Sequence, residues 1–223
     1  MRANLRFTDA GYFWGAHKTA CMDQGIDMEK IALVCFFSYL AGSVNFAILF
    51  FKISGRTDPR LRFSGNAGTT NVYRQAGMTW AIAIFLLDLS RAFAVAMLAM
   101  YVIHVQWLIW ASFFLILGNR FPCFHGFRGG KGVANYLGFT ALVVPWAALL
   151  SAITWVSVYW IKRVPFIASL FMAAVLSIGH AQSQHWALST SIGSCATFAL
   201  IFFNHASNMM QFGKDQPSSL PTE

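Results

Sequence analysis

Charged side chains are scarce in this 223-residue sequence: Asp, Glu, Lys and Arg together make up 11% of it. A soluble domain has about 25%, so the scarcity argues against an ordinary soluble protein. Hydrophobic residues reach 57%. A transmembrane helix needs roughly 20 apolar residues, and the sequence therefore predicts an all-α polytopic membrane protein. The long runs without a charged residue are 31–51, 92–119, 132–161 and 164–213.

Signatures of several common kinds of chemistry are also absent. The four cysteines form no CxxC pair and no zinc-binding spacing, which argues against a disulfide framework and a metal site. The sequence has no HxxxxD general-base motif, no GxSxG nucleophile elbow and no carboxylate cluster for Mg²⁺. We therefore expect no metal and no cofactor, and catalysis would rely on positioning and charge stabilisation.

Positive charge is in excess, with a formal net charge of +8. The basic residues gather in short polar segments separated by two predicted crossings, which is typical of loops on the cytoplasmic side. This distribution indicates anionic membrane lipids or phosphorylated substrates as partners, and not nucleic acid. The clustered basic residues are Lys52, Arg56, Arg60, Arg62, Arg74, Arg120, Arg128, Lys131, Lys162 and Arg163.

The apolar runs divide into about seven transmembrane helices joined by short cytoplasmic glycine-rich loops. One helix over 132–161 would measure about 45 Å at ~1.5 Å per residue, which exceeds the membrane core of ~30 Å. Two short helices that meet near Pro145 are expected there instead. The other predicted spans are 31–51, 77–99, a shorter one ending near 119, 164–179 and 186–203.

Three parts are predicted along the chain. Residues 1–30 form a polar N-terminal extension, expected at the membrane interface, without the pattern of a signal peptide. Residues 31–213 form a single membrane domain, and 214–223 form a cytoplasmic tail. The N-terminus is expected outside and the C-terminus in the cytoplasm, while the oligomeric state is left open.

The segment GGKG places three glycines around one lysine, between two apolar runs. Glycines let the backbone approach a ligand closely, and consecutive N–H groups form an anion-binding concavity. Lysine adds a compact charge suited to phosphate. The segment is not a Walker A motif, because glycine follows the lysine in place of Ser or Thr. The sequence allows two interpretations equally: a phosphate-binding loop or a flexible hinge, formed by Gly129, Gly130, Lys131 and Gly132.

A second polar loop, FSGNAGTTNVYRQAG (63–77), is rich in hydrogen-bond donors. Its arginine, Arg74, can hold a phosphate through two parallel hydrogen bonds. An ordinary polar loop is the alternative, but two such loops on one predicted face favour a phosphate site. The candidate binding residues here are Ser64, Gly65, Asn66, Gly68, Asn71 and Arg74.

Two polar pairs have i, i+3 spacing, which puts both members on one helix face. His205 and Asn208 come at the end of the last span, where they either join a site or simply meet lipid headgroups. Asp88 and Arg91 lie inside an apolar span, where ionisable residues pair or line a site. For the second pair we favour a structural ion pair over a catalytic role.

Five motifs, in this order, resemble the PlsY-type acyl-phosphate:glycerol-3-phosphate acyltransferases, a family of bacterial integral membrane enzymes: YLAGSVNFAILFFK, SGNAGTTNVYR, LLDLSRA, FPCFHGFRGGKGVAN and HASN. The resemblance covers roughly residues 36–213. It implies transfer of a fatty acyl group from acyl phosphate to the 1-hydroxyl of glycerol 3-phosphate. The products would be lysophosphatidic acid and phosphate, in phospholipid biosynthesis. It also implies an inner-membrane enzyme whose site faces the cytoplasm.

The same resemblance assigns roles to residues. Lys131, His205 and Ser64 would be catalytic. Lys131, Arg74 and His205 would hold the glycerol phosphate, and the glycine-loop amides would hold the acyl phosphate. The residues implied in substrate binding are Arg74, Asn208, Asn66, Gly65, Gly68, Asn71, Gly129, Gly130 and Gly132. The chain departs from the family's usual residues at Ala67, Thr69, Asn119 and Arg91, and its third motif is shortened, with Gly213 and Asp215 early.

A membrane transporter or binder of a phosphorylated metabolite is the main alternative. It explains the ionisable residues within a span and the basic loops. It also predicts polar midplane residues on several helices and often inverted repeats, and the sequence has neither. A third hypothesis, that the protein is a catalytically inactive relative with a regulatory role, is supported only by the altered third motif.

Overall fold

The computed structural model describes residues 27–214, in which every regular element is helical. This part of the chain contains ten α-helices and three short 3-10 turns. The turns are η1 (Pro59–Leu61), η2 (Val105–Trp107) and η3 (Cys123–His125). The helices are α2 (Met28–Ser43), α3 (Phe46–Ile53), α4 (Thr69–Ala76), α5 (Met78–Val102), α6 (Leu108–Arg120), α7 (Val133–Val143), α8 (Pro145–Lys162), α9 (Pro165–Ser183), α10 (Leu188–Asn204) and α11 (Ala206–Lys214).

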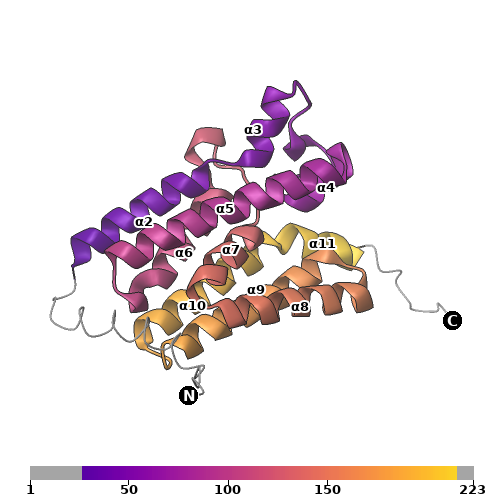
Figure 1. Ribbon diagram of the computed structural model, residues 1–223. Helices are drawn as coiled ribbons and strands as arrows, with labels where there is room; N and C mark the ends of the chain where they lie inside the picture. Colours follow the sequence, from indigo (N-terminus) through magenta and orange to yellow (C-terminus); the bar gives the residue numbers. More distant parts are fainter. Residues whose placement is uncertain (1–26, 215–223) are drawn as a thin grey trace, which may run out of the picture.

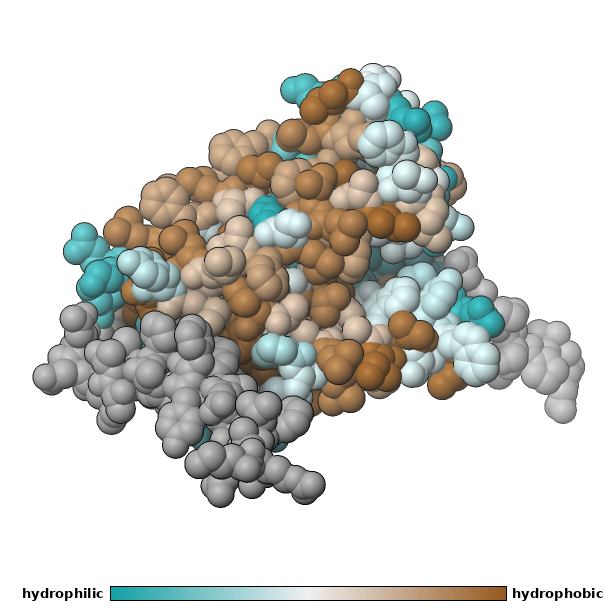
Figure 2. Space-filling view, viewed as in Figure 1, coloured by the Kyte–Doolittle hydropathy of each residue, from teal (hydrophilic) through white to brown (hydrophobic). Residues whose placement is uncertain are grey.

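The predicted extension 1–30 and tail 214–223, with Asp215, lie almost wholly outside the described residues. For the part that is described, four stretches are long and apolar enough to cross a membrane. Helices α7 and α10 are shorter and also apolar. Figure 2 shows hydrophobic colours over the flank of the molecule and hydrophilic colours toward its ends. The predicted all-α membrane fold is confirmed. The four stretches are Met28–Ile53, Met78–Val102, Val105–His125 and Pro165–Ser183.

Two helix breaks test the predicted spans. The break near Pro145 is confirmed, because α7 ends at Val143 and α8 begins with Pro145. The span predicted over 31–51 lies within the apolar stretch Met28–Ile53, but this stretch contains a break that the sequence analysis did not predict, since α2 ends at Ser43 and α3 begins at Phe46. Asn45 explains the break: its side chain accepts a hydrogen bond from the Ile48 N–H at 3.0 Å and so caps α3.

The helices form two groups around α7 (Figure 1). Helices α2, α5 and α6 lie on one side, and α8, α9 and α10 lie on the other. The backbones of α2 and α6 approach each other closely, where Gly42 faces α6 and Gly118 faces α2. A Cβ on Gly118 would overlap the carbonyl oxygen of Tyr39. Small residues allow such close helix packing in membranes.

The segments that follow α3, α6, α8 and α10 come together at one end of the bundle, because residues from each of them line a common cavity. The sequence predicted that these segments share one face, and the structure agrees. The short helices α4 and α11 lie at this end of the bundle (Figure 1), and both contribute residues to the lining of the cavity. The two glycine-containing loops thus belong to one site.

Candidate active site

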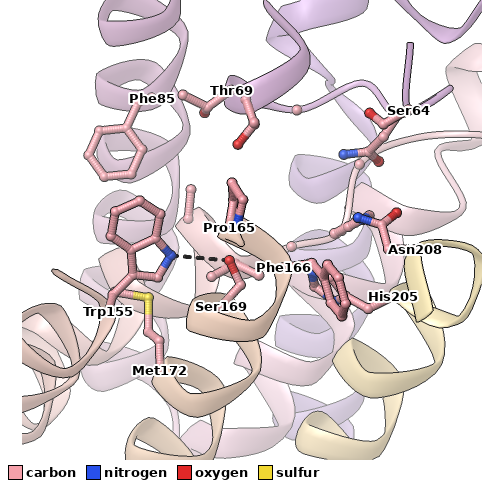
Figure 3. Close-up of a pocket in the computed structure, with 18 of the residues that line it drawn as sticks. Ser64, Thr69, Phe85, Trp155, Pro165, Phe166, Ser169, Met172, His205 and Asn208 are labelled. Atoms are coloured by element: carbon pink, nitrogen blue, oxygen red, sulfur yellow. Dashed lines mark hydrogen bonds between the residues drawn. The ribbon is translucent and has the colours of Figure 1, made fainter. Parts of the chain in front are cut away.

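A cavity of about 650 Å³ opens between the two groups of helices at this end (Figure 3). Gly65 and Gly129, in the loops, and Asn71, in α4, lie behind the wall of the cavity and do not line it. The other predicted residues line the cavity: Ser64, Asn66, Gly68, Arg74, Gly130, Lys131, Gly132, His205 and Asn208.

The first wall is the loop that precedes α4, and Asn71 holds it in shape. The buried Asn71 amide donates to the carbonyl oxygens of Pro59 at 2.7 Å and Asn66 at 2.9 Å. These bonds fold the loop back over the first turn of α4, so that Ser64 faces the cavity. Asn71 is therefore a supporting residue in this structure, although the sequence suggested that it binds substrate.

The second wall is the glycine-rich loop, which lies against the first. The N–H of Gly129 donates to the carbonyl oxygen of Arg120, and the N–H of Gly130 donates to that of Asn119. The carbonyl oxygen of Gly129 accepts from the N–H of Ala67 at 3.5 Å. The expectation that the glycine-loop amides hold a phosphate is therefore wrong for Gly129 and Gly130, whose N–H groups are already engaged.

Two helix N-termini provide free N–H groups instead. Helix α4 begins after Gly68 and α7 after Gly132, and no side chain of residues 27–214 caps either of them. Their first turns line the cavity through Thr69, Thr70, Val133 and Ala134. Free N–H groups and the helix dipole make such termini favourable for anions. Gly132 has φ +87°, and a side chain there would meet Ile116, so glycine suits this close approach.

Positive charge gathers beside these termini. Burial, together with the nearby charges of Arg120 and Arg74, lowers the pKa of Lys131 to about 8. Asn204 donates to the carbonyl oxygen of Lys131 at 3.3 Å and fixes the backbone there. Sequence reasoning placed Arg120 in a basic loop but missed it as a neighbour of Lys131. Such crowding of like charges favours a bound anion.

His205 directly follows α10 and is buried against the cavity. Its Nδ1 lies 2.8 Å from the carbonyl oxygen of Ile201. A carbonyl only accepts, so Nδ1 carries the proton, and Nε2 of the neutral ring is left as an acceptor. Burial and the charge of Lys131 lower the pKa of His205 to about 4. The imidazole is therefore neutral, which does not suit the phosphate-holding role that the sequence suggested.

Asn208 lies one turn further along, on α11. Its side-chain oxygen is buried and has no hydrogen-bond partner within the described part of the chain. Figure 3 shows Asn208, His205 and Ser64 on the same side of the cavity. A buried acceptor without a donor is costly, and a substrate hydroxyl would relieve that cost.

The ion pair expected between Asp88 and Arg91 is present at 2.8 Å. Arg91 also donates to the side-chain oxygens of Asn119 at 3.3 Å and Asn135 at 2.7 Å, and to the carbonyl oxygen of Val44. Arg91 thereby joins α5 to α6, to α7 and to the break between α2 and α3. Asp88 lines the cavity as well, so this buried network supports the site from behind.

The other side of the cavity is apolar. Phe85 of α5, Trp155 of α8 and Met172 of α9 line it (Figure 3). The indole N–H of Trp155 donates to the hydroxyl of Ser169 at 3.2 Å, which satisfies its one polar atom. Sequence reasoning missed these residues, because aromatic and sulfur side chains in apolar spans look like ordinary lipid-facing or core positions. The cavity thus joins a cationic end to an apolar end.

A family model described as glycerol-3-phosphate acyltransferase matches residues 32–214. This chain belongs to that family. The resemblance inferred from five motifs is confirmed. Among the relatives of this acyltransferase, the glycerol-3-phosphate acyltransferase of Pseudomonas fluorescens strain Pf-5 is 39% identical over 139 residues, which span 62% of this chain and 74% of the relative. That of an Anaeromyxobacter species is 35% identical over 182 residues, with coverage of 77% and 87%.

Two crystal structures of PlsY, an integral membrane glycerol 3-phosphate acyltransferase, resemble this acyltransferase. The glycerol 3-phosphate form has a TM-score of 0.76 at 30% identity, and the match covers 82% of this chain and 92% of that one. The lysophosphatidic acid form has a TM-score of 0.73 at 28% identity, with the same coverage. The fold and the membrane character of the family are therefore shared.

Proposed function

We propose that this acyltransferase moves a fatty acyl group from acyl phosphate to the 1-hydroxyl of glycerol 3-phosphate, giving lysophosphatidic acid and phosphate. Family membership supports the acceptor and the product. One observation carries the proposal: a single cavity joins cations and free helix N-termini to an apolar end. A fatty acyl phosphate and a small phosphorylated alcohol together need both ends.

The cationic end suits two phosphate groups. Lys131 and Arg74 neutralise them, and the first turns of α4 and α7 donate N–H groups to their oxygens. The apolar end, with Phe85 and Trp155, receives the acyl chain. Ser64 and Asn208 add hydrogen bonds to the glycerol. The two substrates thus meet with their reacting atoms near the boundary between the two ends.

The reaction needs no covalent nucleophile, because the acyl phosphate is already activated. The 1-hydroxyl oxygen attacks the acyl carbonyl carbon, and the bond from that carbon to the phosphate oxygen breaks. Nε2 of neutral His205 accepts the hydrogen bond of the hydroxyl and so orients it. With a pKa of about 4, His205 is a weak base. The phosphate leaves with the electron pair of the broken bond, and in that form it is a stronger base than His205, so it takes the proton.

We also propose that the site faces the cytoplasm of a bacterial inner membrane. The end of the bundle that holds the cavity also carries the basic segments, including Lys52, Arg128 and Arg163. Short loops rich in Lys and Arg stay on the cytoplasmic side. Glycerol 3-phosphate is a soluble metabolite and would reach the cavity from that side.

The donor is tested with purified protein in detergent, glycerol 3-phosphate and either palmitoyl phosphate or palmitoyl-CoA, in the presence of EDTA. We expect lysophosphatidic acid from palmitoyl phosphate alone, measured by mass spectrometry, with one phosphate released per product. If lysophosphatidic acid forms only from palmitoyl-CoA, the assignment of acyl phosphate as the donor would be wrong. If neither donor gives product while liposomes exchange labelled glycerol 3-phosphate, the transporter alternative would hold.

A further inference from the structure

A second hollow of about 520 Å³ lies where α3 and η3 end. The mechanism above uses none of its residues. Basic side chains dominate its wall, which contains a single carboxylate. The lining residues are Ile48, Lys52, Arg56, Asp58, Arg60, Phe124, His125 and Gly126.

Asp58 neutralises one of the basic residues, Arg60. The Arg60 guanidinium contacts Asp58 through Nε at 2.9 Å and Nη2 at 2.6 Å. Its Nη1 donates to the carbonyl oxygens of His125 at 2.7 Å and Arg128 at 2.8 Å. Arg60 is therefore a structural clamp whose charge and donors are already used. Any further anion in the hollow would meet the remaining basic groups.

Lys52 and Arg56 are exposed at the hollow, and neither makes an ion pair among the residues described. Arg56 lies over the ring of Phe50, 5.8 Å from its centre, which leaves its donors available. Asp58 is taken by Arg60. Within the described part of the chain, the hollow therefore keeps two positive charges that no carboxylate balances.

His125 adds an unused polar atom to the same wall. Its Nε2 is buried and has no hydrogen-bond partner within residues 27–214. Leaving such an atom unpaired is unfavourable. Beside Lys52 and Arg56, the group that satisfies all three is an anion with several oxygens, such as a phosphate.

The position of the hollow relative to the membrane identifies the source of that phosphate. Two of the stretches that are long and apolar enough to cross a membrane, Met28–Ile53 and Val105–His125, end here. Ile53 is 79% exposed and Phe124 is 60% exposed, so apolar side chains flank the basic groups. A site at the end of two spans, with an apolar rim and a basic centre, matches the depth of lipid headgroups.

We propose that this hollow binds the phosphate of an anionic phospholipid. Lys52 and Arg56 pair with its charge, His125 hydrogen-bonds to an oxygen, and the acyl chains lie along Ile53 and Phe124. The lipid would sit against the clamp of Arg60, which holds the segment just before the glycine loop. The site is separate from the acyl-transfer cavity.

Native mass spectrometry of the delipidated protein tests this proposal with phosphatidylglycerol, phosphatidylcholine and inorganic phosphate. We expect phosphatidylglycerol to bind more tightly than phosphatidylcholine. Replacing both cations (Lys52→Ala with Arg56→Ala) should weaken phosphatidylglycerol binding about 30-fold, since each basic group near the membrane surface accounts for about fivefold. Equal binding of the two lipids, or competition by inorganic phosphate at the same concentration as the lipid, would overturn the lipid assignment.

Two controls locate the binding. The pair Lys162→Ala and Arg163→Ala removes two exposed charges at the same end of the bundle and should leave binding within about twofold of the wild type. Lys131→Ala should also retain binding, since Lys131 belongs to the other cavity. If the Lys162/Arg163 pair weakens phosphatidylglycerol binding as much as the Lys52/Arg56 pair does, binding depends only on total charge and the proposed site is wrong. If Lys131→Ala weakens it, the lipid binds in the active-site cavity instead.

Discussion

The lowered pKa of Lys131 predicts how the acyltransferase responds to alkaline pH. Burial and the charges of Arg120 and Arg74 bring that pKa to about 8. The cationic form then falls from about 90% of the free enzyme at pH 7 to about 10% at pH 9. Glycerol 3-phosphate stays a dianion over this range, because the second pKa of a phosphate ester is near 6. If only the cation binds it, kcat/KM should fall about tenfold.

The assay is kcat/KM for glycerol 3-phosphate at pH 7, 8 and 9, from initial rates with palmitoyl phosphate in excess. This ratio reports the pKa of the free enzyme. At saturating glycerol 3-phosphate, kcat should fall less, because the bound phosphate favours protonated Lys131. The variant Lys131→Arg, whose guanidinium stays charged throughout the range from pH 7 to 9, should lose the pH dependence even if it is slower. A wild-type kcat/KM that is flat from pH 7 to 9 would refute the reasoning.

Three further predictions concern packing, the buried ion pair and the acyl chain. Gly118→Ala should lower the thermal unfolding midpoint by several degrees, because overpacking costs about 1–3 kcal/mol; an unchanged midpoint would contradict the close packing of α2 and α6. Arg91→Ala leaves Asp88 buried without its partner, at a cost of about 3–5 kcal/mol, so the yield of folded protein should drop sharply, whereas a normal yield would argue against the network. Trp155→Ala should raise KM about tenfold for palmitoyl phosphate and little for butyryl phosphate; equal effects on both donors would remove Trp155 from the acyl-chain end.

Much of the fold could be predicted because membrane insertion leaves a strong pattern in the sequence. Uncharged runs located the spans, and Pro145 marked the break between α7 and α8. Basic loops that alternate with crossings placed the loops of Ser64 and Lys131 on one face. The structure then brings both residues to one cavity. These predictions succeeded because each depends on local composition or on whether an even number of membrane crossings separates two loops.

The remaining features depend on contacts between distant residues. Asn45 ends α2 inside an apolar run, and its amide reaches the carbonyl oxygen of Ala67 at 3.3 Å. Gly129 and Gly130 give their N–H groups to the end of α6, although their local sequence suggests free donors. The tautomer of His205 follows from the carbonyl oxygen of Ile201. No local pattern in the sequence reports which partner a polar group finds in three dimensions.

The most direct test of the central claim compares the wild type with Lys131→Ala. Both proteins receive palmitoyl phosphate and glycerol 3-phosphate, and lysophosphatidic acid and phosphate are measured together with the thermal unfolding midpoint. For the wild type, equal amounts of the two products are expected. The variant should keep its midpoint and lose about 100-fold or more in rate, the usual loss on removing one charge-stabilising donor. A variant that turns over as fast as the wild type would contradict the assignment of this cavity as the active site.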